Sequence, residues 1–210
     1  MYIGDKKLED WGIVTDLDVG EAPIREKGYT VPGRMGKVDA TDALTGYPIY
    51  DNRPLSIKLF IKTQSAEDYQ KILDDINAYC HGKVRKITFS HDKDYYYKGR
   101  LKVSPGKNNK TYGDVTITGS MYPYAMKEQL TQIDVSSSTA AAREVVLQNE
   151  EMPTKINIET DGDITITRGS SRNVYSAGKH IINAPLLIED ETVIVEGAVT
   201  ATISYQEGKL

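Results

Sequence analysis

The sequence predicts a mostly β protein with an α+β N-terminal domain, an extended arm or belt, and an all-β C-terminal sandwich. Three observations carry this prediction. From Leu55 to Thr63, large aliphatic residues recur at every second position up to Ile61 and alternate with Ser56, Lys58, Phe60 and Lys62. This pattern is typical of a strand with one buried face. One stretch after Ser65 has helical periodicity. Beyond Thr139 the chain consists of short β-branched runs separated by turn residues.

Residues 1–50 contain few periodic runs. A stretch so rich in turn formers predicts short strands and ordered loops without a core of their own. Such a segment needs another surface to lie against, as an arm does. The interrupting residues are Gly12, Gly20, Pro23, Gly28, Pro32, Gly33, Gly36, Gly46 and Pro48.

The next segment predicts a strand followed by one helix. Ser65 is a suitable N-cap, and Asp68 stands three residues later as in a capping box. Gly82 can adopt the left-handed backbone conformation that commonly ends a helix. The apolar residues at helical spacing are Tyr69, Ile72, Leu73, Ile76, Tyr79 and Cys80.

Three strand candidates follow the helix and predict a β-meander. They are Val84–Ser90, Tyr95–Ser104 and Tyr112–Tyr122. Turn-rich His91–Asp94 and Pro105–Lys110 separate them, as in antiparallel hairpins. The helix is expected to cover one face of this sheet.

A polar stretch around residues 126–139 predicts a domain boundary near Leu130, with domains at 1–130 and 131–210. Ala140–Gln148 fits a short helix or a strand equally well. The remaining runs predict a small sandwich or jelly roll. The expected strands are Lys155–Glu159, Asp163–Thr167, His180–Ile182, Thr192–Glu196 and Ala198–Tyr205.

Composition indicates an ordinary soluble protein with neither a secretory signal nor a membrane span. The 14 tyrosines against 2 phenylalanines favour surfaces half buried between partners. Residues 81–110 carry nine basic and two acidic side chains in a chain of net charge −4. Because the whole chain is acidic and no helix carries a basic stripe, a solvated face or a patch for an acidic neighbour is favoured over nucleic-acid binding. Lys98, Arg100 and Lys102 are the candidates for this patch.

No residue constellation predicts catalysis, a metal site or a cofactor. The three histidines, His81, His91 and His180, are placed in different elements. Asp92 and Asp94 fit turn formation better than a glycosidase pair. The lone cysteine, Cys80, sits on the apolar stripe of the helix and is expected to be buried and inert.

The stretch VPGRMGKVD, Val31 to Asp39, is the most specific motif. Pro32 and Gly33 predict a turn, Arg34 presents a guanidinium fork, and Gly36 allows close backbone approach. Together with the following residues, this region resembles the N-terminal region of siphophage distal tail proteins, often called Dit. The matching positions are Pro32, Gly33, Arg34, Gly36, Asp39, Tyr50, Asn52 and Arg53.

The resemblance extends to the helix, the meander and the Tyr122-Pro123-Tyr124 segment. The β-rich part of the chain that ends at Tyr205 is similar to the family's C-terminal galectin-like domain. Two departures stand out. Met35 occupies a position where a polar or acidic residue is expected. The C-terminal domain is short and lacks an insertion for carbohydrate binding, which argues against direct host recognition.

The resemblance implies a structural hub in the virion tail tip of a phage or prophage, made in the host cytoplasm. It implies a hexameric ring held by belts, with the eight motif residues at the contacts. One side of the ring would join the tail-tube protein and the other a tail-associated lysin or fibre protein. The outer domains would hold receptor-binding proteins. Two other classes stay open: a carbohydrate-binding module, and a cell-wall hydrolase whose catalytic residues the sequence does not reveal.

Overall fold

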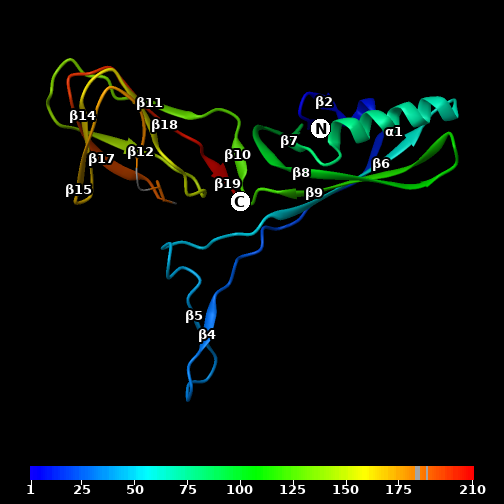
Figure 1. Cartoon of the computed structure of the whole chain (residues 1–210), viewed down its shortest axis with the longest axis horizontal. Helices are drawn as coiled ribbons and strands as arrows, with labels where there is room; N and C mark the ends of the chain where they lie inside the picture. Colours follow the sequence, from blue (N-terminus) through cyan, green and yellow to red (C-terminus); the bar gives the residue numbers. More distant parts are fainter. Residues whose placement is uncertain (183–184, 188) are drawn as a thin grey trace. The chain divides into compact units, whose positions relative to one another are not determined.

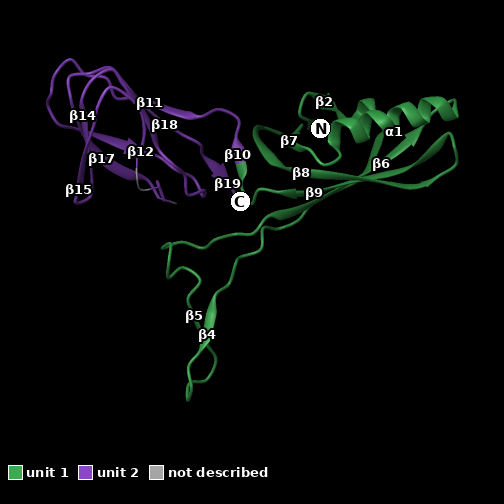
Figure 2. Ribbon diagram, viewed as in Figure 1, with its two compact units in different colours: residues 1–125 green, residues 126–210 purple. Residues whose placement is uncertain are grey.

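A computed structural model describes residues 1–182, 185–187 and 189–210 of the chain. The described residues form antiparallel sheets and one α-helix, which confirms the mostly β class. The chain divides into two compact units, Met1–Ala125 and Met126–Leu210 (Figure 2). The division lies a few residues before the expected boundary at Leu130.

Unit 1 is built on one antiparallel sheet with the strand order β2-β1-β7-β8-β9-β6-β3 (Figure 1). Helix α1 lies along one face of this sheet. A short 3-10 turn, η1, precedes β3. The elements of the sheet and η1 are β1 Tyr2–Ile3, β2 Lys6–Lys7, η1 Leu8–Asp10, β3 Ile13–Val19, β6 Arg53–Lys62, β7 Val84–Phe89, β8 Asp92–Asn108 and β9 Tyr112–Met121.

Strand β6 and helix α1 confirm the two clearest sequence patterns. Leu55, Ile57, Leu59 and Ile61 of β6 are all buried, while the residues that alternate with them are partly or fully exposed. Each fully buried aliphatic side chain contributes about 1.5–3 kcal/mol to folding. This alternation fixes the register of β6 against β9, because a slip of one residue would expose the whole row.

Helix α1 spans Ala66–Cys80. The Asp68 backbone N–H donates to the Ser65 side-chain oxygen at 3.1 Å, and the Ser65 hydroxyl donates in turn to the Asp68 carboxylate. Gly82, at φ +72°, follows the helix as predicted. The side chains that face the sheet are Tyr69, Leu73, Ile76 and Cys80, with Ile72 and Tyr79 partly buried beside them.

The first residues of the chain correct one prediction. Ile3, Leu8 and Trp11 are buried in the core of unit 1, so residues 1–19 are part of the domain. The segment without a core is therefore shorter than expected and runs from residue 20 to residue 52. A few large apolar side chains between turn formers were enough to anchor the start of the chain.

The meander differs from its prediction at both turns. Strand β8 begins at Asp92, inside the expected turn, and continues through Pro105 to Asn108. The register against β9 shifts between Pro105 and Asn108. Pro105 itself still pairs with Val115, and the irregularity follows it without ending the strand.

Unit 2 is a sandwich of two four-stranded antiparallel sheets, β11-β18-β13-β16 and β12-β17-β14-β15. One core cluster draws side chains from both sheets, including Ile158, Ile203, Ile166 and Val195. The strands of the sandwich are β11 Thr131–Asp134, β12 Arg143–Leu147, β13 Asn157–Thr160, β14 Ile164–Arg168, β15 Ser171–Tyr175, β16 Gly178–Ile181, β17 Glu191–Glu196 and β18 Ala201–Tyr205. Two further short strands, β10 Ala125–Lys127 and β19 Gly208–Lys209, pair with each other outside the sandwich.

Four of these strands, β10, β11, β15 and β19, were not predicted, and the open choice for Ala140–Gln148 resolves as strand β12. Strand β12 pairs with β17 through all five of its residues. Strand β15 is polar and largely exposed, so the sequence carries no burial pattern there. Strand β11 lies in the region assigned to the boundary. The galectin-like relationship of this sandwich stays a prediction.

Candidate functional site

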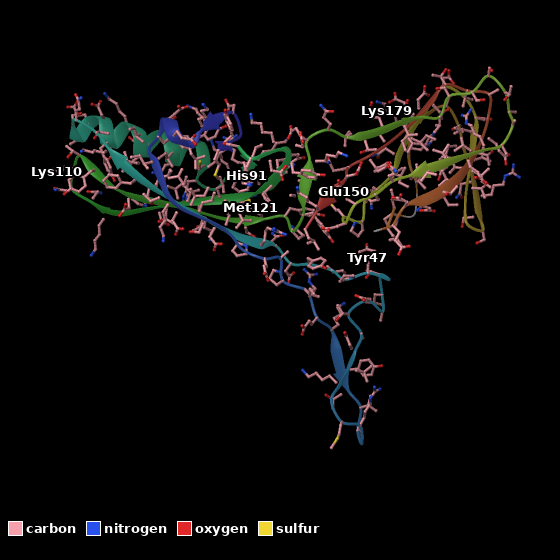
Figure 3. All side chains as sticks on the ribbon, turned by 180° about the vertical axis from the view of Figure 1, so that it is seen from behind. Tyr47, His91, Lys110, Met121, Glu150 and Lys179 are labelled. Carbon is pink, nitrogen blue, oxygen red and sulfur yellow. The ribbon has the colours of Figure 1, made fainter. Side chains whose placement is uncertain are left out.

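Residues 20–52 form an arm that leaves the sheet after β3 and returns to it at β6 (Figure 1). None of these residues is buried, and Figure 3 shows their side chains standing on both sides of the ribbon. Several are large and apolar. A two-stranded ribbon with no buried face is only marginally stable in water. Because the arm has no buried residue, its apolar side chains form a surface that its own chain does not cover. The exposed apolar residues are Ile24, Tyr29, Val31, Met35 and Leu44.

The motif VPGRMGKVD forms the outer half of this arm. Strands β4 Gly28–Thr30 and β5 Lys37–Asp39 pair as a separate two-stranded sheet. Between them the Arg34 N–H donates to the Val31 carbonyl at 3.1 Å across Pro32-Gly33. Proline at the second position and a glycine at φ +83° at the third position are the requirements of a type II turn. The predicted turn is therefore present.

Gly36 has a different role from the one predicted. No described residue lies within 4 Å of the position that a Cβ would occupy, so no described backbone of the same chain approaches closely there. Its φ is +77°, a conformation that favours glycine. Gly33 and Gly36 thus shape the tip and leave Arg34 and Met35 between them in solvent.

Asp39 is engaged within its own arm. Its carboxylate accepts hydrogen bonds from the Thr41 N–H at 2.9 Å and from the Thr41 hydroxyl at 2.6 Å. These two bonds lower the pKa of Asp39, with the hydroxyl as the larger cause. An aspartate that bonds two residues ahead closes a local turn. Its local role is to order the end of β5.

The two strands of the arm are joined again near its root. Arg25 forms an ion pair with Asp51, and the Arg25 N–H donates to the Ile49 carbonyl at 2.8 Å. A backbone bridge pairs Ile24 with Tyr50. These bonds make the arm a continuous ribbon. No local pattern indicates the Arg25–Asp51 pair, since the partners are 26 residues apart.

Tyr50, Asn52 and Arg53 fasten this ribbon to the sheet. Tyr50 packs edge-on against Tyr124 at 5.9 Å between ring centroids. The Asn52 amide donates to the Ser120 hydroxyl at 3.0 Å. Arg53 is 7% exposed and begins β6. The eight predicted contact residues therefore fall into two sets: Pro32, Gly33, Arg34, Gly36 and Asp39 in the outer arm, and Tyr50, Asn52 and Arg53 at its root.

Lys98, Arg100 and Lys102 lie on β8 and are all exposed. They alternate with buried Leu101 and Val103, so the three cations share the face of the sheet away from the core. The Arg100 guanidinium donates to the Gly82 carbonyl. The predicted basic patch is thus one continuous row on a strand.

The histidines do not meet. The His81 Nδ1 accepts the Val103 N–H at 3.1 Å, His91 stacks on Phe89, and the His180 Nε2 lies 2.7 Å from the Ser176 carbonyl oxygen. Among the described residues, no group of three or more His, Cys, Asp or Glu side chains could hold a metal ion. Within the same residues, no helix is both long and apolar enough to cross a membrane.

Cys80 is buried, as predicted, and burial raises the pKa of its thiol to about 11.

A carbohydrate-binding surface normally needs an aromatic ring whose face is open to solvent. Unit 2 has two aromatic residues, Tyr175 and Tyr205, and both are buried. Neither can stack on a sugar from solvent.

No protein-family model and no curated protein matches this sequence. Among solved structures, the chain is similar to SPP1 Dit (gp 19.1), described as a paradigm of the hub adsorption apparatus in phages that infect Gram-positive bacteria. The TM-score is 0.71 at 15% identity, over 99% of this chain and 98% of that chain. The chain has the Dit fold. The resemblance seen in residues 31–61 is thus confirmed at the level of the fold.

The Dit fold accounts for both units and the arm in one alignment, since the match covers both chains almost completely. A designed double-stranded β-helix also aligns, at 14% identity over 39% of this chain and 99% of the designed one. Its TM-score of 0.26 is too low to carry an argument.

Proposed function

We propose that this chain is a structural subunit of a phage tail tip, in which its copies assemble into a hexameric ring. The observation that carries the proposal is the Dit fold along the whole chain, since SPP1 Dit is described as part of a hub adsorption apparatus. The site contributes no catalytic group to this function. Its chemistry is that of an assembly contact.

The arm supports a ring built from one repeated contact. It exposes large apolar side chains and has no buried residue, so a neighbouring subunit can supply the surface that it lacks. An arm on one side of a subunit and a receiving surface on the other form a heterologous contact, which closes into a ring when the rotation between copies permits. Six copies are the number implied by the resemblance to distal tail proteins.

The same resemblance supplies the proposed neighbours. One side of the ring joins the tail-tube protein, and the other joins a tail-associated lysin or fibre protein. The sandwich of unit 2 is the proposed attachment point for receptor-binding proteins. The basic row Lys98, Arg100 and Lys102 is exposed on the sheet and is proposed to meet an acidic patch of another subunit. The proposed location is the virion tail tip.

The test is the size and shape of the purified full-length chain. Light scattering coupled to size exclusion gives its mass, and negative-stain microscopy gives its symmetry. A six-fold ring with a central opening is the expected result. A chain that stays a 23.4 kDa monomer at every concentration would rule the hub proposal out.

A further inference from the structure

The edge of the sheet at β3 carries an open recess of about 470 Å³. Its lining is mainly apolar and includes residues of both strands, β3 and β6. The turn between η1 and β3 supplies the remaining wall. The lining residues are Glu9, Trp11, Gly12, Ile13, Val14, Phe60 and Lys62.

Two features keep this recess open. The Trp11 indole N–H donates to Asp75 Oδ2 at 2.6 Å, and its ring packs on Tyr79 at 5.8 Å between centroids. Gly12 leaves the floor clear, since a Cβ there would lie 2.7 Å from the Phe60 carbonyl oxygen. The recess is therefore preformed by bonds within unit 1.

The strand beside the recess has an open edge. Among the described strands β3 pairs with β6 alone. Ile13 is 66% exposed and Leu17 is 39% exposed. An unpaired edge with exposed apolar side chains is a surface that proteins normally cover or protect. A partner is therefore expected on this edge.

The tip of the arm has a side chain suited to such a recess. Met35 is 99% exposed and stands between the two positive-φ glycines Gly33 and Gly36. A thioether side chain is flexible and polarisable, fills irregular apolar gaps and makes favourable contacts with aromatic rings. Because Met35 is almost fully exposed, it does not fill the recess of its own chain.

The charges of the arm tip and of the segment that borders the recess are complementary. Residues 27–38 carry Lys27, Arg34 and Lys37 and no acidic side chain. Residues 9–18, which border the recess and form most of β3, carry four carboxylates and no basic side chain. Two of these already have cations, since Glu9 pairs with the N-terminus and Asp16 with Lys58. The other two, Asp10 and Asp18, form no ion pair within the described part of the chain.

We infer that Met35 of one copy seats in the recess of Trp11, Ile13 and Phe60 on the next copy. Arg34 and Lys37 then lie against the acidic segment 9–18 of that copy. The inference rests on the proposed ring and names its contact. The partner is a second copy because both complementary surfaces belong to this chain and neither is covered within it.

Cross-linking between two differently sized versions of the full chain tests this contact. One version carries Met35→Cys and the other, with a solubility tag, carries Ile13→Cys. Cys80 is buried and stays in both. After mixing and mild oxidation, we expect a mixed disulfide as the main product. Leu44→Cys is the matched control, because Leu44 is 82% exposed on the same arm and should give several-fold less product with Ile13→Cys.

The outcomes separate the contact from the ring. A ring in which Met35→Cys cross-links no better than Leu44→Cys would overturn the contact and leave the hub intact. An unmodified chain that never assembles would contradict both the contact and the ring. Met35→Asp is a second variant: we expect it to raise the concentration needed for assembly at least several-fold, whereas Met35→Leu should assemble normally. Unchanged assembly of Met35→Asp also contradicts the contact.

Discussion

The Arg53 guanidinium lies over the ring of Tyr97, 5.2 Å from its centroid, where the arm rejoins the sheet. It also donates to the Tyr97 hydroxyl at 3.4 Å. The two residues belong to strands β6 and β8, which lie on either side of β9. This pair ties the first residue of β6, at the root of the arm, to strand β8.

Replacing Arg53 with alanine should therefore loosen the root of the arm. We expect the free energy of unfolding of unit 1 to fall by about 1–3 kcal/mol, because a largely buried hydrogen bond and a cation–π contact are both lost. Chemical denaturation measures the loss of stability. Faster proteolysis within residues 20–52 reports the loosened root of the arm. Thr30→Ala, at an exposed position on β4, should change neither. Equal stability of Arg53→Ala and the parent chain would contradict the anchoring role.

Gly33→Ala should distort the arm without weakening either core. The third position of the Pro32-Gly33 turn has φ +83°, where a side chain costs about 1 kcal/mol. We expect weaker self-association by sedimentation equilibrium and unchanged thermal unfolding of both units. Thr30→Ala, exposed on β4, is the control. Unchanged association of Gly33→Ala would show that the turn does not present the tip.

Reversing the charge of Lys98, Arg100 and Lys102 to glutamate should weaken assembly, most strongly at low salt, because exposed charges are screened beyond about 10 Å at 0.1 M ionic strength. The three side chains point away from the core, so the fold should be kept. Mass measured by light scattering at low and high salt checks this prediction. An oligomer that stays intact at both salt concentrations would exclude a role for the row.

Cys80 should make the stability of unit 1 fall at high pH. Burial raises the pKa of its thiol from 9.0 to about 11, so the folded state holds the proton more tightly than the unfolded state. The stabilisation is complete below the unfolded value and is lost as pH rises through the window from 9 to about 11. Urea unfolding across this window should show a weaker decline for Cys80→Ala. Rapid modification of native Cys80 by a thiol reagent at pH 8 would contradict its burial.

Tyr205→Phe should destabilise unit 2 alone. The Tyr205 hydroxyl is buried and donates to the Gln148 carbonyl at 2.5 Å. Its removal leaves that carbonyl without this donor, at a cost of about 1–3 kcal/mol. Chemical denaturation followed by backbone amide signals of each unit should show a shift in unit 2 only. Tyr122→Phe, at a half-exposed position in unit 1, should be nearly neutral.

The sequence alone indicated the elements whose side chains repeat with a clear period. Strand β6 and helix α1 were located because burial on one face imposes a period of two or of about 3.6. Strand β15 escaped prediction because four of its five residues are exposed. The core role of Leu8 and Trp11 was not predicted for another reason. Single buried residues between turn formers create no periodic pattern in the sequence.

The candidate site was predicted as a segment and not as a set of contacts. Turn chemistry at Pro32 and Gly33 can be read from neighbouring residues. The pairing of Arg53 with Tyr97 joins residues 44 apart, and no local pattern specifies such a contact. The partner contact expected of Asp39 stays a prediction, and its carboxylate also binds a hydroxyl two residues away. Local motifs locate the arm, whereas tertiary packing decides which motif residues remain free.

The most direct test of arm-mediated assembly compares the mass of the full chain with that of a version in which residues 27–41 are replaced by a short turn. Light scattering at matched concentrations gives both masses. We predict six times 23.4 kDa for the full chain and a folded monomer for the shortened one. A full chain that remains monomeric, or a shortened chain that still forms the same ring, would contradict assembly through the arm.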